Sequence, residues 1–139
     1  MKSVKIKINN KTYNIDEGKT ILEAAREHGI WIPTLCHDTR LEPYGGCRIC
    51  LVEVKGARQL QVSCITKINE GMEVCTESEN IQKTRKGVLE YILSDHPLDC
   101  MTCEATACCE LQDVAYSMGI KGEAYRSEEK RGGVLPDRN

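Results

Sequence analysis

Nine cysteines dominate the chemistry that this sequence of 139 residues can perform. Thiolates bind metals, form disulfides or carry out redox reactions, and their spacing distinguishes among these uses. The cysteines form two groups that each contain a C-x2-C pair, and their number is odd. An odd, clustered set favours metal binding in a reducing compartment over a disulfide framework. We therefore expect a cytoplasmic protein, since the opening segment also lacks the apolar core of a signal peptide.

The first group spaces four cysteines as C-x10-C-x2-C-x13-C, and Gly45 and Gly46 stand directly before the second of them. Four thiolates suit a [2Fe–2S] cluster or one zinc ion. Residues without a Cβ let backbone N–H groups approach inorganic sulfide, which favours the iron–sulfur interpretation over a structural zinc site or a thioredoxin-like dithiol. The predicted ligands are Cys36, Cys47, Cys50 and Cys64.

In the second group a histidine precedes the cysteines, in the pattern H-x3-C-x2-C-x5-C. Pro97 disfavours helical geometry at His96, so a preceding helix should end near Asp95 and leave the imidazole on a turn. One nitrogen and three thiolates then form a donor set for a metal centre, with zinc among the candidates. Cys108 adjoins Cys109 and competes with it as a ligand. The predicted ligands are His96, Cys100, Cys103 and Cys109.

The elements that position the first group follow from periodicity. Apolar residues alternate on both sides of an Asn-Asn-Lys turn, which predicts a β-hairpin, and Thr20 with Glu23 forms a capping box that opens a helix. We expect a mixed sheet with one packed helix. Its predicted elements are strands at 4–8, 12–15, 49–54, 59–63 and 72–75 and a helix of about ten residues that ends at Gly29.

Around the second group the chain is mostly helical. A second capping box, Thr76 with Glu79, predicts a helix from about 80 to 94, and a short helical run follows at 110–118. The glycine-rich and charged residues 119–139 are typical of a linker. Cys75 falls outside both groups, and its place in a strand pattern predicts a small buried apolar residue.

Composition excludes several classes of protein. The formal charge is −2, from 19 basic and 21 acidic residues, and no basic stripe is present, which argues against nucleic-acid binding. The aliphatic runs are too short to span a membrane. The sequence contains no dinucleotide fingerprint, P-loop or catalytic-triad pattern, so we predict an electron-transfer component without a catalytic site of its own.

The order of elements and cysteines resembles that of plant-type ferredoxins, although their first two ligands are spaced by about four residues and not ten. The longer gap, the His-Pro-Leu-Asp-Cys start and the Cys-Glu-Leu-Gln-Asp end of the second group resemble the N-terminal iron–sulfur module of the complex I large iron–sulfur subunit, and of NAD(P)-linked [FeFe]-hydrogenases and formate dehydrogenases. This resemblance covers about residues 1–118. It implies a [4Fe–4S] cluster on the second group, and its sequence context favours Cys109 over Cys108.

The resemblance implies an α+β fold in which a β-grasp [2Fe–2S] ferredoxin-like domain, 1–78, precedes a small, mostly helical His-Cys [4Fe–4S] domain, 79–118. A linker or tail, 119–139, would follow. The implied function is to relay single electrons between a flavin-containing NAD(P)H dehydrogenase subunit and other iron–sulfur subunits of a larger complex. The chain ends where longer relatives continue, which suggests a short subunit or a truncated piece. A zinc-stapled interaction module without a redox role is the alternative.

Overall fold

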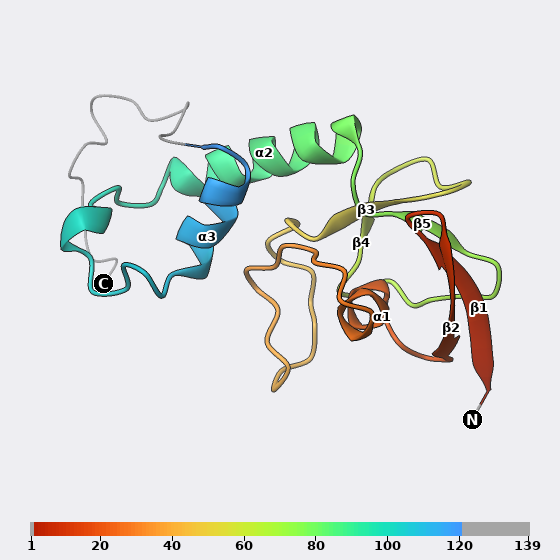
Figure 1. Cartoon of the computed structure of the whole chain (residues 1–139). Coiled ribbons are helices and arrows are strands. Elements are labelled where there is room, and N and C mark those ends of the chain that lie inside the picture. Colours follow the sequence, from red (N-terminus) through yellow and green to blue (C-terminus); the bar gives the residue numbers. More distant parts are fainter. Residues whose placement is uncertain (1, 121–139) are drawn as a thin grey trace, which may run out of the picture. The chain divides into compact units, whose positions relative to one another are not determined.

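The computed structural model describes residues 2–120, and the chain divides after Arg85 into two compact units (Figure 1). The first unit contains a five-stranded mixed sheet and the helix α1, and the second is helical. The predicted α+β class is confirmed. No helix in the described part of the chain is long and apolar enough to cross a membrane.

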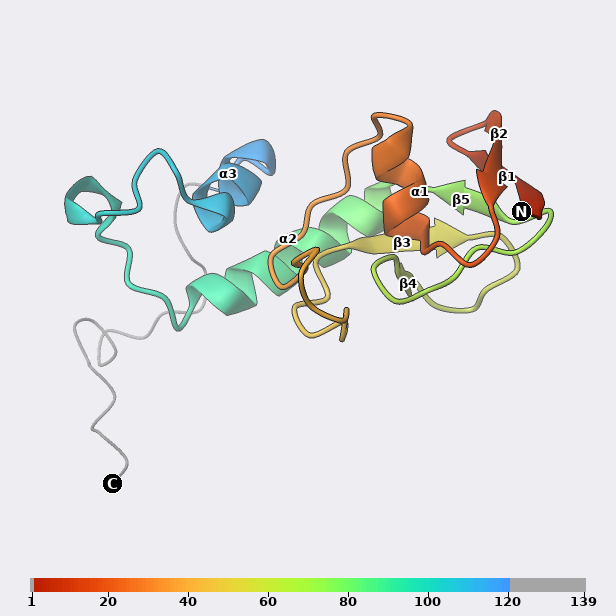
Figure 2. The same ribbon diagram turned by 90° about the horizontal axis from the view of Figure 1, so that it is seen from below.

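The sheet of the first unit has the strand order β2-β1-β5-β3-β4. β1 and β5 are parallel, whereas β1 with β2, β3 with β5 and β3 with β4 are antiparallel. The parallel pair forms because the helix and the cysteine loops separate the two strands in sequence. Figure 2 shows the sheet and α1 from a second direction. The strands are β1 (Ser3–Ile8), β2 (Lys11–Asp16), β3 (Leu51–Val54), β4 (Gln61–Val62) and β5 (Glu73–Cys75).

The predicted hairpin is formed by β1 and β2, with Ile8 opposite Lys11. Asn9 and Asn10 between them both have positive φ, 50° and 68°, which a two-residue hairpin turn of type I′ requires and asparagine tolerates. The side chain of Asn9 also reaches β5: its Oδ1 accepts from the backbone N–H of Thr76 at 2.9 Å, and its Nδ2 donates to Thr76 Oγ1 at 2.7 Å. The turn therefore anchors the hairpin to the end of the sheet.

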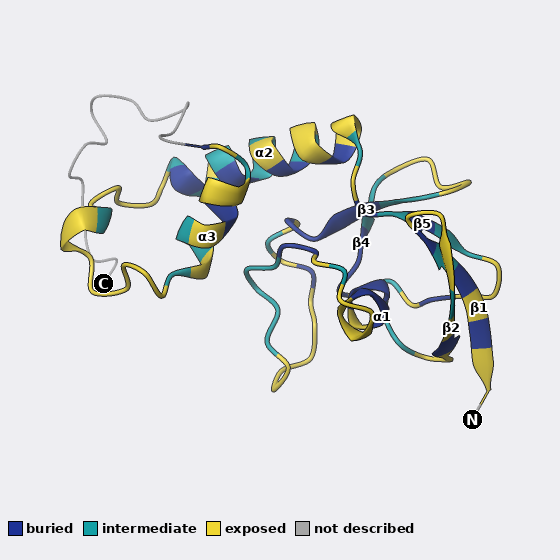
Figure 3. Ribbon diagram, viewed as in Figure 1, coloured by how far each residue is buried: buried dark blue, intermediate teal, exposed yellow. Residues whose placement is uncertain are grey.

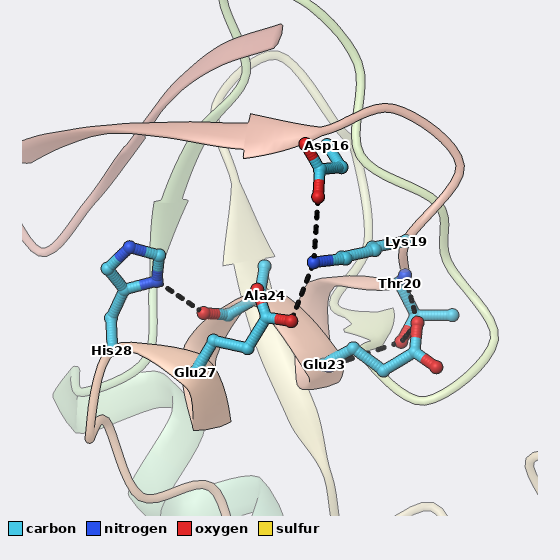
Figure 4. A network of polar contacts seen from close by, with 7 residues as sticks. All are labelled: Asp16, Lys19, Thr20, Glu23, Ala24, Glu27 and His28. Carbon is cyan, nitrogen blue, oxygen red and sulfur yellow. Dashed lines mark hydrogen bonds and ion pairs between the residues drawn. The ribbon is translucent and has the colours of Figure 1, made fainter. Parts of the chain in front are cut away.

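Helix α1 (Ile21–Glu27) begins at the predicted capping box, in which Glu23 N–H donates to Thr20 Oγ1 at 3.2 Å and Thr20 N–H donates to Glu23 Oε2 at 2.8 Å. Lys19 lies between Asp16, at 3.4 Å, and Glu27, at 2.6 Å (Figure 4). The helix ends two residues before Gly29, because the backbone N–H groups that follow turn back onto the last carbonyls.

The core of the first unit is aliphatic. Alternate residues of β1 are buried beneath α1, and Figure 3 shows the same alternation of buried and exposed positions along the strand. Branched aliphatic side chains fill the space that aromatic residues take in other small domains, which fits a chain without phenylalanine. The central members are Val4, Ile6, Ile8, Ile21, Leu22, Val52 and Val74.

Helix α2 (Glu79–Leu93) starts close to the predicted position, but the predicted capping box is wrong. Ser78 Oγ, not Thr76, accepts the backbone N–H of Ile81, at 3.1 Å. Thr76 is buried and bonded to Asn9 instead. A partner distant in sequence therefore took the hydroxyl that the local pattern assigned to the helix.

The second unit contains the end of α2, a short 3₁₀ turn η1 (Cys100–Thr102) and helix α3 (Glu110–Ser117). Its buried apolar residues come from both helices and from the residue after them. The predicted linker lies outside the described residues except for its first two positions. The buried residues are Leu89, Leu93, Val114, Ala115 and Ile120.

Candidate metal centres

Two of the predicted ligands are fixed by the sheet. Cys50 immediately precedes β3 and Cys64 follows β4 by one residue, and each is only 2% exposed. Ser63 between them is buried, and both its backbone N–H and its Oγ donate to the carbonyl of Cys50, at 3.2 and 2.7 Å. The antiparallel pairing of β3 with β4 and this double hydrogen bond therefore hold the two cysteines together.

The other two ligands, Cys36 and Cys47, lie half-buried on the long loop between α1 and β3. The backbone N–H of Cys47 lies 3.4 Å from Cys36 Sγ. Burial opposes ionisation of Cys36, but hydrogen bonds from the backbone and thiol of Cys47 and the backbone of Gly46 lower the pKa of this thiol. The loop thus presents N–H groups that stabilise a thiolate at Cys36.

The deeper pair responds differently. Burial, the charge of Cys50 and a hydrogen bond with its thiol, and then the charges of Cys36 and Cys47, raise the pKa of Cys64 to about 12. Burial also raises the pKa of Cys47. Four thiolates in one place repel one another, so a cationic metal is needed to hold all of them in the ionised form.

The loop between the two pairs adopts its shape at two residues with positive φ, Gly45 at 65° and Arg48 at 62°. Gly45 is buried, and a Cβ there would lie 3.0 Å from Ile65 Cδ1 and 3.4 Å from Val62 Cγ1. Glycine is therefore required at 45 by backbone conformation and by close packing. The glycine pair was visible in the sequence, whereas the left-handed conformation of Arg48 and the role of Ser63 were not.

The four cysteines of the first group gather as two contacting pairs, Cys36 with Cys47 and Cys50 with Cys64. Within residues 2–120, no three His, Cys, Asp or Glu side chains converge closely enough to hold a single metal ion. Two thiolates for each of two metal atoms is the donor arrangement of a [2Fe–2S] cluster, whereas structural zinc takes four donors at one ion. The residues present therefore fit a two-iron cluster.

The structure does not bring the second group together in the same way. His96 is exposed and follows α2, with its backbone N–H donating to the carbonyl of Leu93 at 3.2 Å. Cys100 and Cys103 lie at the two ends of the 3₁₀ turn, and Cys109 is the residue before α3. These four residues share one segment of chain, and their assignment as ligands stays a prediction.

The two remaining cysteines differ from each other. Cys75 is not the buried apolar residue that the strand pattern predicted: it is half-buried at the end of β5, and its Sγ lies 2.9 Å from the carbonyl of Glu77. Cys108 is exposed, with Ala107 before it at a positive φ of 71°, whereas Cys109 is half-buried. The two adjacent cysteines thus have different surroundings.

Comparison with known proteins supports both sites. Residues 1–79 match the 2Fe-2S iron-sulfur cluster binding domain, and residues 85–123 match the NADH-ubiquinone oxidoreductase-G iron-sulfur binding region. The chain is 41% identical over 128 residues to the second G-type subunit of the NADH-quinone oxidoreductase of Rhizobium meliloti, and the match covers 92% of the chain and 15% of that protein. It is 42% identical over 135 residues to NADP-reducing hydrogenase subunit HndD of Solidesulfovibrio fructosivorans, with coverages of 93% and 23%.

One more relative and one solved structure extend this similarity. NADPH-Fe(3+) oxidoreductase subunit alpha of Geobacter sulfurreducens is 38% identical over 122 residues, which are 88% of this chain and 14% of that protein. A crystal structure of an NAD+-reducing [NiFe]-hydrogenase in the H2-reduced state aligns with a TM-score of 0.80 at 29% identity, over 90% of this chain and 54% of the other. The chain therefore spans less than a quarter of the three relatives matched by sequence.

The mixed sheet, the gathered cysteines and these matches define a ferredoxin-like [2Fe–2S] domain followed by a [4Fe–4S] binding region. The chain belongs to the iron–sulfur family represented by the N-terminal region of the G-type NADH-quinone oxidoreductase subunits and by NAD(P)-linked hydrogenase subunits. The resemblance inferred from the sequence and the two predicted cofactor types are confirmed.

Proposed function

We propose that this chain is an electron-transfer module of a multi-subunit oxidoreductase and relays single electrons through two iron–sulfur clusters. The observation that carries the proposal is the arrangement of the first four cysteines as two contacting pairs on a ferredoxin-like sheet. A bound [2Fe–2S] cluster supplies reversible one-electron transfer without a substrate-binding site. The protein has to hold, shield and tune such a cluster.

The ligand roles follow the pairs. Cys36 and Cys47 would hold one iron from the exposed side, and Cys50 and Cys64 would hold the other from the core side. The half-buried pair lies on the loop, where an electron can enter or leave, while the buried pair excludes water. Backbone N–H groups of Gly46 and Cys47 stabilise negative charge on this side.

For the second cluster the proposed ligands are His96, Cys100, Cys103 and Cys109. Replacing one thiolate with a neutral imidazole removes one negative charge from a cluster, which makes it easier to reduce. The two clusters would thereby differ in reduction potential. The match of residues 85–123 to an iron–sulfur binding region supports this assignment.

The partners are proposed from the relatives. Subunits named for NADH-quinone, NADP and NADPH-Fe(3+) reactions share this region, so we infer a flavin-containing NAD(P)H dehydrogenase subunit on one side and further iron–sulfur subunits on the other. A hydrogenase, formate dehydrogenase or complex I-like enzyme would be the setting, in the cytoplasm.

Anaerobic purification with iron, sulfide and zinc analysis and EPR of the reduced protein tests the proposal. We expect about six iron atoms and six sulfides per chain and two distinct reduced signals. About two zinc ions, no sulfide and no EPR signal would establish the zinc-stapled module instead. Electron transfer is then measured by reduction of the clusters with NAD(P)H in the presence of a flavin-containing dehydrogenase subunit.

A further inference from the structure

Arg85 of helix α2 is the largest fully buried side chain in the described part of the chain, at 1% exposed. Its Nη2 donates to the carbonyl of Leu51 at 2.6 Å, and Leu51 follows Cys50 directly. All three residues belong to the first unit. The guanidinium is therefore placed beside the buried half of the first cysteine group.

The charge of Arg85 has no close compensation. No carboxylate lies within 4.0 Å of its guanidinium among residues 2–120, and its Nε has no hydrogen-bond partner there. Burial lowers the pKa of Arg85, and the negative groups that oppose this effect are Glu77, Cys50 and Cys75. Arginine nevertheless stays protonated in proteins, so a full positive charge is buried here. Such a charge is retained only where a negative partner offsets the loss of hydration.

The first cysteine group provides that partner once it is loaded. Four thiolates around two iron atoms and two sulfides leave a net charge of about −2, and reduction adds one electron and no proton, giving about −3. A nearby positive charge stabilises the more negative, reduced form more strongly, and a buried location weakens the screening of this attraction. The same charge opposes the repulsion among the four thiolates.

We propose that Arg85 is the buried counter-charge of the [2Fe–2S] cluster and raises its reduction potential. The inference rests on the proposed assignment of Cys36, Cys47, Cys50 and Cys64 as ligands. Arg85 acts on the cluster through its charge and through its hydrogen bond to the carbonyl of Leu51, the residue after a ligand. A merely structural Arg85 would stabilise the fold without affecting the potential.

The test is an anaerobic redox titration of the full chain, reduced with dithionite and followed by the EPR signal of the [2Fe–2S] cluster. Arg85→Gln removes the charge and keeps a hydrogen-bond donor, whereas Arg85→Lys keeps the charge. Lys83→Gln, on the exposed side of α2, removes an equal charge from the same helix and serves as the control. Thermal unfolding of each variant reports its structural effect separately.

In Arg85→Gln we expect the equilibrium constant for one-electron reduction to fall at least threefold, which corresponds to about 28 mV at 59 mV per tenfold change. Arg85→Lys and Lys83→Gln should stay close to the unchanged protein. Loss of the cluster in Arg85→Gln but not in Arg85→Lys would also support the counter-charge, since assembly then needs the charge.

Two results would overturn the inference: an unchanged potential in Arg85→Gln, or loss of the cluster in both Arg85 variants, which would make the shape of the side chain decisive. Absence of a cluster from the unchanged protein would instead remove the proposed function on which this inference rests.

Discussion

The backbone N–H of Cys47 lies 3.4 Å from Cys36 Sγ, within a loop that has no regular secondary structure. This contact places the first two ligands side by side, although ten residues separate them in sequence. The second pair, Cys50 and Cys64, depends instead on the pairing of β3 with β4. One site is thus built from a loop half and a sheet half.

Removal of one ligand from either half should abolish the [2Fe–2S] cluster. In Cys36→Ala and Cys64→Ala we expect about one third of the iron to be lost, because two of six iron atoms belong to this cluster. Cys75→Ala is the matched control, since Cys75 lies outside both pairs and its thiol contacts the carbonyl of Glu77. Iron analysis and EPR measure the result. Equal iron in Cys64→Ala and Cys75→Ala would contradict the ligand assignment.

The adjacent cysteines of the second unit give a sharper comparison. Cys109→Ala should remove the [4Fe–4S] signal and about two thirds of the iron, whereas Cys108→Ala should retain both. Cys109 is half-buried at the start of α3, and Cys108 is exposed. The EPR spectrum of the reduced variants decides between them. Loss of the signal in Cys108→Ala alone would exchange the two roles.

The fold of the first unit follows from local patterns that the sequence displays. The alternation around Asn9 and Asn10 predicted the hairpin, and Thr20 with Glu23 predicted the start of α1, because both signals involve residues within one turn of each other. The pattern at Thr76 failed for the opposite reason. Asn9, 67 residues away, competes for that hydroxyl, and Ser78 caps α2.

The same distinction applies to the candidate sites. Spacing and the glycine pair were sufficient to select the four cysteines of the first group as ligand candidates. Nothing local marks Arg85 as buried, since it stands in a polar stretch of a helix and its partner Leu51 is 34 residues away. For the second group, sequence patterns selected a segment but not its conformation, because ligands in short turns carry no periodicity.

The N-terminal cap of α1 should contribute measurably to stability. Thr20→Ala removes the acceptor for the backbone N–H of Glu23 and should lower the free energy of unfolding by about 1 kcal/mol. Thr20→Ser keeps the hydroxyl and should lower it by much less. Chemical denaturation of the loaded protein, followed by circular dichroism, measures both changes. Equal losses in the two variants would mean that the methyl group of Thr20, and not its hydroxyl, is what matters.

Lys19 predicts a pH dependence. Its hydrogen bond with Glu27 raises the pKa of Lys19 above the ordinary value of 10.5, although burial acts in the opposite direction and Asp16 adds to the increase. A raised lysine pKa means that the folded state binds the proton more tightly, so this contribution is complete below pH 10.5 and is lost as the pH rises through the folded-state value.

Unfolding of the unchanged protein and of Lys19→Met, compared at about pH 8 and at about pH 11.5, should show a stability difference that shrinks at the higher pH. Glu27→Gln, which removes the main partner of Lys19, should reduce the same difference already at about pH 8. A difference that stays constant across this range would show that the contribution of Lys19 is packing of its alkyl chain.

Gly45 links backbone conformation to cluster binding. It combines a positive φ of 65° with a space in which a Cβ would lie 3.0 Å from Ile65 Cδ1. Gly45→Ala therefore meets two costs: about 1–2 kcal/mol for the left-handed conformation, and a displacement of the loop that carries Cys47. We expect lower stability together with a reduced content of [2Fe–2S] cluster.

Gly56→Ala separates these two costs. Gly56 has a positive φ of 87° in the turn after β3, but a Cβ there would meet no atom within 4 Å. This variant should lose about 1–2 kcal/mol of stability from backbone strain and keep its full iron content. If Gly45→Ala also kept its full iron content, the loop would tolerate a side chain at 45, and the close approach to Ile65 would not be needed to position Cys47. A selective loss of iron in Gly45→Ala would show that this packing holds the loop in the conformation that binds the cluster.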